Sequence, residues 1–159
     1  MSKPPQCPVF ETVKLIGDKW SLLIIRDIMF HDKRHFGELL NSKEGIAKNI
    51  LSNRLKKLVE NAVIVKAPDY THKQKNKYTL SYKGIQLIPL LIEFFQFDLS
   101  MENLSEKNLE LYVQIRDNRV DFQENLENEL TREIDFVFKN NPILQKETIR
   151  REFPNIKIY

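Results

Sequence analysis

Residues 36–67 read FGELLNSKEGIAKNILSNRLKKLVENAVIVKA and change character three times along their length. Residues 36–40 suit a short helix, and residues 41–45 supply the polar side chains and the glycine of a turn. From residue 47 to residue 61, apolar side chains recur every three or four positions, which is the spacing of an amphipathic helix. Residues 62–67 then favour a strand, because valine and isoleucine dominate them. The stretch therefore predicts two helices joined by a turn, with a strand after them.

A hairpin and a long helix extend this pattern on its C-terminal side. Residues 68–76 form a polar loop, and residues 77–80 suit a strand that returns alongside the first. Ser81 is a good helix N-cap, and apolar residues follow it at helical spacing. We expect one helix over residues 81–97 that is kinked at Pro89, because a proline inside a helix removes a backbone hydrogen bond.

Two more helices are expected on the N-terminal side. Pro8 suits the first turn of a helix that Gly17 would end. Asp18 is a good N-cap for a second helix over residues 19–30, which is apolar on nearly all sides and is therefore central. Its Trp20 is expected in the core rather than in a ligand site. The order of elements describes a mostly α fold with a small β-hairpin (α+β), a winged helix-turn-helix.

A segment with its own helical signal follows the winged helix. Apolar residues at three- and four-residue spacing from Phe122 to Phe138 predict a helix that Asn140-Asn141-Pro142 ends, and a short helix is expected over residues 143–153. We therefore divide the chain into a winged helix domain, residues 1–97, and extra C-terminal helices, residues 98–159, which serve dimerisation, dock on the core or bind a partner. Three acidic residues of the longer helix are expected to face outward: Glu127, Glu129 and Glu133.

The charge of the chain is unevenly distributed, although its net value is only +3. Residues 43–83 carry 10 basic and 3 acidic side chains, whereas residues 98–159 carry 9 basic and 13 acidic ones. A localised basic region is the electrostatic signature of a nucleic-acid-binding protein. The strongest basic region coincides with the second helix of the helix-turn-helix and the hairpin, so both are candidates for contact with duplex DNA.

The polar face of the helix over residues 47–61 carries the candidates for reading bases. Asparagine can form two hydrogen bonds with adenine, and lysine can reach guanine in the major groove. The alternative is an ordinary solvated helix face, but its position between a short helix and a basic hairpin favours DNA contact. The candidate residues are Lys48, Asn49, Ser52, Asn53 and Lys56.

The hairpin, or wing, carries the candidates for contacting the DNA backbone or the minor groove. Lys73, Lys75 and Lys77 alternate along residues 68–77, so an extended hairpin would place them on one side. Solubility is the alternative role for these lysines. Arg34 and His35 precede the short helix and are further candidates for phosphate contact, together with Lys33. Arg54 either contacts a phosphate or forms a structural ion pair, and the sequence leaves both open.

Four motifs stand in order between residues 7 and 97. They are Cys7-Pro8 followed by LIGDKWSLLI (15–24), HFGEL (35–39), GI (45–46) with LSNRLKKL (51–58), and YTLSYKG (78–84). In this order they resemble the HxlR-type regulators, a branch near the MarR superfamily. The resemblance implies bacterial, dimeric, DNA-binding winged helix proteins that regulate transcription, often as repressors.

Two positions depart from the family pattern, both at the ends of the helix over residues 47–61. The family usually places serine or threonine where Ala47 stands, and alanine caps a helix poorly. It usually places glycine near Ala62, so we expect Asn61 to take the left-handed conformation there instead. These departures concern helix boundaries and leave the predicted fold unchanged.

Cys7 and the first helix raise the questions of regulation and assembly. Cys7 would lie at a helix N-terminus, where the helix dipole stabilises a thiolate. Several members of the family that the chain resembles sense oxidants or electrophiles through a cysteine at this motif; the alternative is an inert residue. The resemblance implies a homodimer, because one recognition helix reads few bases, and the first helix and residues 85–95 are candidates for its seam.

Several other classes of protein are disfavoured by the sequence. A single cysteine and three histidines without ligand spacing argue against a metal site, and we expect no cofactor. Acid, base and nucleophile are nowhere grouped, so we expect no enzyme. Short apolar runs and a polar, proline-rich start predict a cytoplasmic protein without a membrane partner. The remaining alternative is a winged helix that binds another protein and no DNA.

Overall fold

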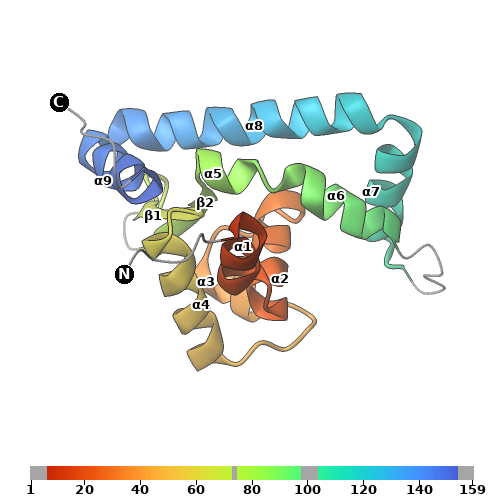
Figure 1. Cartoon of the computed structure of the whole chain (residues 1–159), viewed down its shortest axis with the longest axis horizontal. Coiled ribbons are helices and arrows are strands. Elements are labelled where there is room, and N and C mark those ends of the chain that lie inside the picture. The colour runs from red at the N-terminus through yellow and green to blue at the C-terminus, as the bar shows by residue number, and fades with distance from the viewer. Residues whose placement is uncertain (1–6, 73–74, 98–103, 154–159) are drawn as a thin grey trace.

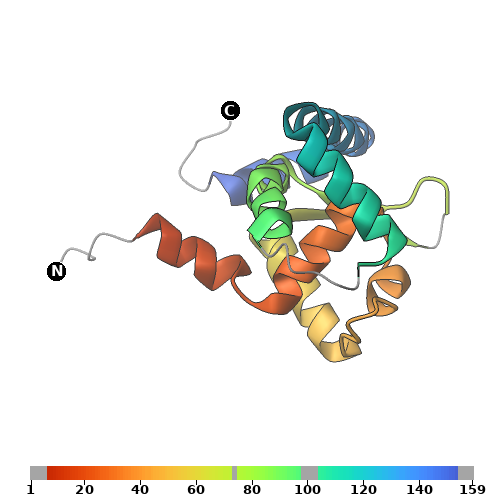
Figure 2. The same cartoon turned by 90° about the vertical axis from the view of Figure 1, so that its right-hand side faces the viewer.

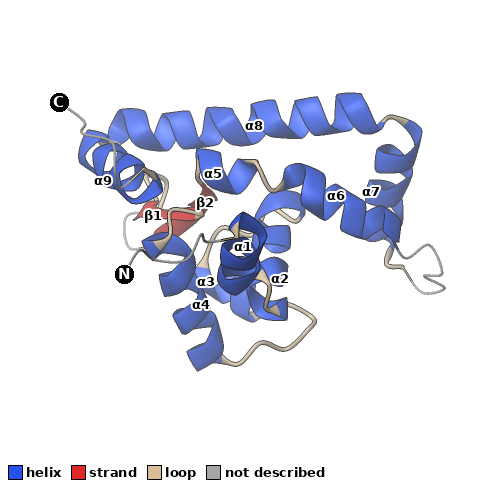
Figure 3. Cartoon of the chain, in the orientation of Figure 1, coloured by secondary structure: helices blue, strands red, loops and turns tan. Residues whose placement is uncertain are grey.

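The computed structural model describes residues 7–72, 75–97 and 104–153 as a set of helices around a two-stranded antiparallel sheet (Figures 1 and 3). The mostly α winged helix-turn-helix fold predicted from the sequence is confirmed. The described elements are α1 (Pro8–Ile16), α2 (Lys19–Phe30), α3 (Phe36–Leu40), α4 (Lys48–Glu60), β1 (Ile64–Pro68), β2 (Asn76–Leu80), α5 (Tyr82–Ile85), α6 (Ile88–Phe97), α7 (Glu106–Asp117), α8 (Arg119–Asn140) and α9 (Pro142–Glu152).

The helix-turn-helix forms because α2 and α4 bury their apolar faces against each other. Ile25 and Ile28 of α2 and Leu51 and Leu58 of α4 are each fully buried. At the turn between α3 and α4, Gly45 adopts a φ of 69°, a left-handed conformation that glycine takes without strain. The Leu and Ile spacing thus decides which side of α4 faces the core, and the opposite side faces solvent.

The hairpin begins later than the sequence predicted. Strand β1 starts at Ile64, which pairs with Leu80 in the antiparallel register. The expectation that Asn61 takes the left-handed conformation is wrong: its φ is −99°, and Ala62 has the positive φ of 55° instead. A left-handed conformation costs alanine some energy, and here Ala62 adopts it while being only 1% exposed.

The predicted kinked helix over residues 81–97 is two helices. Helix α5 ends at Ile85, and α6 begins at Ile88, so that Pro89 stands in the first turn of α6. A proline is tolerated there because the N–H groups of the first turn have no partner within the helix. Ser81 caps α5 as expected, since its hydroxyl accepts the N–H of Gly84.

The C-terminal helices share the core of the winged helix. Helix α7 was not predicted. Helix α8 begins at Arg119, before the first predicted apolar position, and ends at Asn140 as predicted; it lies across α5 and α6 in Figure 1. Five side chains of α7 and α8 belong to the same cluster of buried apolar residues as the winged helix: Ile115, Leu130, Ile134, Val137 and Phe138. The C-terminal segment is therefore packed against the domain that precedes it.

Candidate nucleic-acid interface

The outer face of α4 presents polar side chains to solvent. All five residues that the sequence singled out on this helix are exposed: Lys48, Asn49, Ser52, Asn53 and Lys56. Within the described part of the chain, the one side-chain partner recorded for these five is Glu60, whose carboxylate lies 3.8 Å from the Lys56 ammonium. The face is therefore available to a ligand that offers hydrogen-bonding groups.

Arg54 and Asp18 fix the orientation of α4. Asp18 caps α2 by accepting the backbone N–H of Ser21 at 3.1 Å, and it also accepts the Nε–H of Arg54 at 2.8 Å. Burial opposes ionisation of Asp18, but the hydrogen bonds from Ser21 and Arg54 prevail and lower its pKa. Of the two roles left open for Arg54, the structure shows the ion pair. The pair ties α4 to the N-terminus of the central helix α2.

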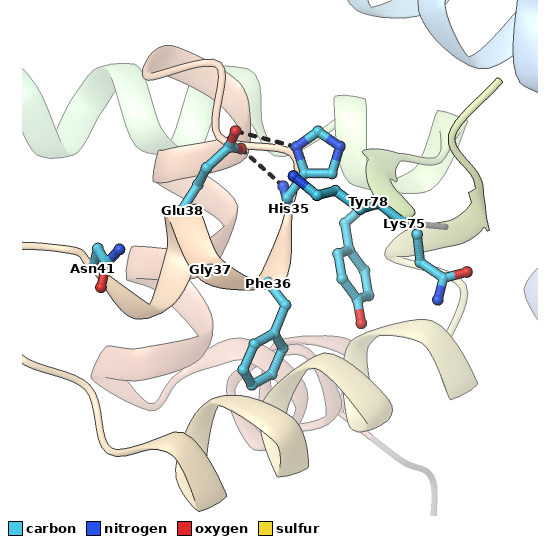
Figure 4. A pocket seen from close by; sticks show the side chains of 8 residues that line it. His35, Phe36, Gly37, Glu38, Asn41, Lys75 and Tyr78 are labelled. Carbon is cyan, nitrogen blue, oxygen red and sulfur yellow. Dashed lines mark hydrogen bonds and ion pairs between the residues drawn. The ribbon is translucent and has the colours of Figure 1, made fainter. Parts of the chain in front are cut away.

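A hollow of about 560 Å³ lies between α3 and the wing. Figure 4 shows Phe36 of α3 and Tyr78 of β2 pointing to the same side of it, with Asn41 and Lys75 around it. Lys75 is exposed, and no ion pair is recorded for it within the described residues. The hollow is lined by His35 and Lys75, two of the residues that the sequence assigned to contact with the DNA backbone or the minor groove.

His35 joins α3 to the wing rather than facing solvent alone. Its Nε2 lies 2.7 Å from an Asp69 carboxylate oxygen, and its Nδ1 lies 3.1 Å from Glu38, the contact drawn in Figure 4. Glu38 also accepts the backbone N–H groups of Arg34 and His35, at 2.7 and 2.9 Å. The hydrogen bond to Asp69 contributes most to raising the pKa of His35, and the bond to Glu38 adds to it, although burial acts in the opposite direction. Burial opposes ionisation of Glu38, but its hydrogen bonds hold its pKa at about 2.

Arg34 and Lys77 are engaged inside the protein, contrary to the expectation that they face phosphates. Arg34 is 8% exposed and forms two parallel hydrogen bonds with the Glu133 carboxylate, with Nε–Oε1 at 2.9 Å and Nη2–Oε2 at 3.0 Å. Lys77 Nζ lies 2.8 Å from the same carboxylate. Lys33 likewise pairs with the buried Asp27, at 2.6 Å. Arg34, Lys77 and Lys33 are therefore paired with carboxylates of the same chain and are not part of the exposed basic surface.

Their alternation predicted a common face for three wing lysines, and two of them, Lys75 and Lys77, lie within the described residues. Lys73 lies outside the described residues. Lys77 sits in β2 with its side chain 33% exposed and turned toward Glu133. Of the three lysines predicted to share a face, Lys75 is the one that the described part of the chain shows to be exposed and without a recorded ion pair.

Cys7 stands at the start of an exposed apolar surface. It is the N-cap of α1, it is exposed, and Pro8 follows it in the first turn as predicted. Helix α1 projects from the rest of the chain in Figure 2, and a groove of about 370 Å³ runs between it and α6. The groove is lined mainly by apolar residues, several of them well exposed: Val9, Val13, Leu90 and Phe94.

The described residues show neither a membrane-spanning helix nor a metal-binding group. No helix among them combines the length and the apolar character that a bilayer requires. No three histidine, cysteine or carboxylate side chains in the described ranges are grouped so that they could hold a metal ion.

Comparison with known proteins places the chain in a family. The family model described as the HxlR-like helix-turn-helix matches residues 15–107, which is more than half of the chain. The chain belongs to the HxlR-like family. The match includes every element from α2 to α6 and stops at the start of α7, so the HxlR-like part carries α4 and the wing, and α8 lies beyond it.

Individual relatives resemble the HxlR-like part of the chain. An uncharacterised HTH-type transcriptional regulator of Synechocystis is 30% identical over 86 residues, which are 54% of this chain and 63% of that protein. The chain thus spans less than two thirds of this relative's length. The crystal structure of PA1607, a candidate transcription factor, is 40% identical with a TM-score of 0.56 over 64% of this chain and 69% of its own. A candidate MarR-family regulator of Porphyromonas gingivalis W83 is 30% identical with a TM-score of 0.51, over 65% of this chain and 99% of its own.

Two acidic residues that bind the basic side chains beside α3 and the wing were not identified from the sequence. Glu133 was expected to face outward, but its side chain is only 18% exposed and binds Arg34 and Lys77. Asp69 binds His35 from the wing loop. Glu38 did carry a local signal, since a glutamate three residues after an N-cap position is typical of a capping box. Glu133 carried none, because 99 residues separate it from Arg34.

Proposed function

We propose that this HxlR-like chain is a sequence-specific, double-stranded DNA-binding regulator of transcription that acts as a homodimer and represses its target genes. The observation that carries the proposal is the exposed polar face of α4 beside the α3–wing hollow. Family membership and the names of the relatives support it, since several are called HTH-type transcriptional regulators. Repression would follow from a dimer occupying promoter DNA.

The division of labour between α4 and the wing follows from their side chains. Asn49 and Asn53 are one helical turn apart on the exposed face of α4, and an asparagine amide can both donate to and accept from adenine. Lys48 and Lys56 flank them and can reach guanine or a phosphate. Lys75 at the edge of the hollow suits a phosphate, which carries no sequence information. Helix α4 would therefore select the sequence, and the wing would add affinity.

The groove between α1 and α6 is the surface that we assign to the homodimer. Exposed apolar patches of this kind on soluble proteins mark interaction sites, and a second copy would cover Val13 and Phe94, which are 58% and 49% exposed. Val13→Asp should give a monomer by light scattering. Val120→Asp changes a similarly exposed valine on α8, outside the groove, and should leave the dimer intact. Equal behaviour of the two variants would remove the groove from the dimer interface.

A salt titration against a random-sequence duplex tests DNA binding itself. Each phosphate contact makes log affinity fall with log salt by about 0.9, so several contacts per dimer predict a steep slope. Negligible binding at low salt would defeat the regulator and leave a winged helix that binds another protein. We expect the steep salt dependence, because residues 43–83 carry 10 basic and 3 acidic side chains.

Cys7 is the candidate for a redox response. It is exposed at the N-terminus of α1, the helix that lines the proposed dimer groove, so its modification would act at the interface between subunits. With one cysteine per chain, a disulfide has to join two chains or include a small thiol. Treatment with diamide should lower the DNA affinity of the wild type and leave Cys7→Ser unaffected. An unchanged wild type would show that Cys7 is no sensor.

A further inference from the structure

Helix α8 contacts the wing although the two are distant in sequence. The family match ends at residue 107, and α8 begins at Arg119, so the contact is made by a part of the chain outside the matched region. In Figure 1, α8 runs across the domain from the α7 side to the side on which the hairpin lies. Its C-terminal half, from Leu130 onward, packs into the shared core.

Glu133 of α8 binds two cations at the base of the wing. Its carboxylate accepts two hydrogen bonds from Arg34, at 2.9 and 3.0 Å, and lies 2.8 Å from Lys77 Nζ. Arg34 is held on its other side by a hydrogen bond to the Ile28 carbonyl, and its own carbonyl accepts the N–H of Tyr78 in β2 at 2.8 Å. One carboxylate thus connects the end of α2, the segment before α3, and the returning strand of the wing.

A second contact joins the wing loop to the end of α8. The Tyr70 hydroxyl donates to the Asn140 carbonyl at 3.2 Å. The rings of Tyr70 and Phe136 meet at 87° with centroids 6.2 Å apart, an edge-to-face arrangement that stabilises aromatic pairs. The wing is therefore held by α8 both at its base and in its loop.

We propose that α8 is a clamp that sets the position of the wing on DNA, with Glu133 as its positioning residue. The proposal rests on the DNA-binding function above and adds a form of control to it. The Arg34 and Glu133 side chains are 10% and 18% exposed, so salt screens their pair weakly and the clamp persists at the salt concentrations in which DNA binds. Glu133 also holds Lys77 away from the DNA, so that of Lys75 and Lys77 it is Lys75 that meets a phosphate.

Hydrogen–deuterium exchange of the free, full-length chain tests the clamp without DNA. Glu133→Gln removes the charge that holds Arg34 and Lys77, so exchange over residues 69–80 should become faster. Glu129→Gln is the matched control, because Glu129 is exposed one turn away on the same helix and no ion pair is recorded for it among the described residues. Equal exchange in the two variants would overturn the clamp.

Lys77→Gln keeps the test decisive if Glu133→Gln fails to fold. This variant leaves the Arg34–Glu133 pair in place and removes only the wing's side of the clamp. Exchange over residues 69–80 should be faster than in Lys75→Gln, which removes an exposed lysine two residues away. No difference between the two lysine variants would again overturn the clamp.

DNA binding by the same lysine variants separates a clamp residue from a phosphate contact. With a labelled random-sequence duplex, Lys75→Gln should reduce the salt slope by about 0.9 per protomer, and Lys77→Gln should leave it unchanged. An equal reduction in both would mean that Lys77 contacts phosphate and would overturn its assignment to the clamp. Absence of wild-type binding at low salt defeats the proposed function instead, and the exchange experiment still judges the clamp.

Discussion

The outer face of α4 and the base of the wing are both rich in basic residues, yet the structure uses them differently. On α4, Lys48 and Asn49 are exposed, and no side-chain partner is recorded for them in the described ranges. At the base of the wing, Arg34 and Lys77 share the Glu133 carboxylate, and His35 lies between Asp69 and Glu38. A basic residue near a DNA-binding element is therefore a candidate contact only if no carboxylate of the same chain has already bound it.

The difference arises from burial. Arg34 is 8% exposed, and a buried guanidinium requires a carboxylate and further hydrogen bonds to offset its lost hydration. Lys48 remains hydrated and requires no partner. The wing base thus contributes to the stability of the fold, whereas the α4 face is left to a ligand, and the two regions should respond differently to the same kind of substitution.

The largest expected effect is on stability. Arg34→Ala leaves Glu133 partly buried with Lys77 as its remaining partner, and should lower the free energy of unfolding by about 3 kcal/mol. Lys48→Ala, on the exposed face of α4, should change it by less than about 0.5 kcal/mol. Urea denaturation followed by circular dichroism measures both. Similar losses in the two variants would erase the distinction between the regions.

The next effect is on DNA recognition and concerns α4 alone. Asn49→Ala and Asn53→Ala should each cost about 1–3 kcal/mol of discrimination between the preferred operator and single-base variants of it. The operator is first selected by the wild type from a random duplex library, and affinities are then compared by competition. Neither variant should lose much stability, since both residues are exposed.

Asn128→Ala is the control for this measurement. Asn128 is an exposed asparagine on α8, outside the proposed interface, so its loss should leave discrimination unchanged. If the α4 variants behaved like Asn128→Ala, base reading would have to be assigned to another element. If they weakened all sequences alike, α4 would act as a backbone-contacting helix.

Local patterns in the sequence were sufficient for most of the winged helix. Apolar spacing gave α2 and α4, and the N-cap role of Asp18 is confirmed by its hydrogen bond to Ser21. The break before α6 was missed because Pro89 is compatible both with a kink and with the first turn of a new helix. Helix α7 was missed because its apolar periodicity is weak: Ile115 is the single buried residue among the twelve of this helix.

The candidate site likewise has a part that local sequence patterns predict and a part that depends on contacts between distant segments. The exposed face of α4 could be predicted, because residues on one helix keep their relative positions whatever the rest of the chain does. The shared partner of Arg34 and Lys77 could not be predicted, since Glu133 is 99 residues away from Arg34 in the sequence and lies in a segment with many other acidic residues. An ion pair of this kind depends on how α8 packs, which no short-range pattern encodes.

The smallest effect is the pH dependence that His35 gives to the wing base. Its pKa in the folded chain is raised by Asp69 and Glu38 above the unfolded value of about 6.5. Protonated His35 therefore stabilises the fold fully below the unfolded pKa, and this contribution is lost as the pH rises through the folded pKa. The effect is small because the ring is partly exposed and its ion pairs are screened by solvent.

His31 complicates that measurement because its pKa is lowered, chiefly by burial, so it destabilises the fold as the pH falls. The two histidines oppose each other, and the wild type alone would conceal both. The difference in Tm between the wild type and His35→Asn isolates His35, since asparagine still suits the N-cap of α3. That difference should be largest below the unfolded pKa of about 6.5 and should shrink as the pH rises through the raised pKa of His35. A difference independent of pH would mean that His35 joins α3 to the wing as a neutral hydrogen-bonding group, and that its charge contributes nothing to the wing base.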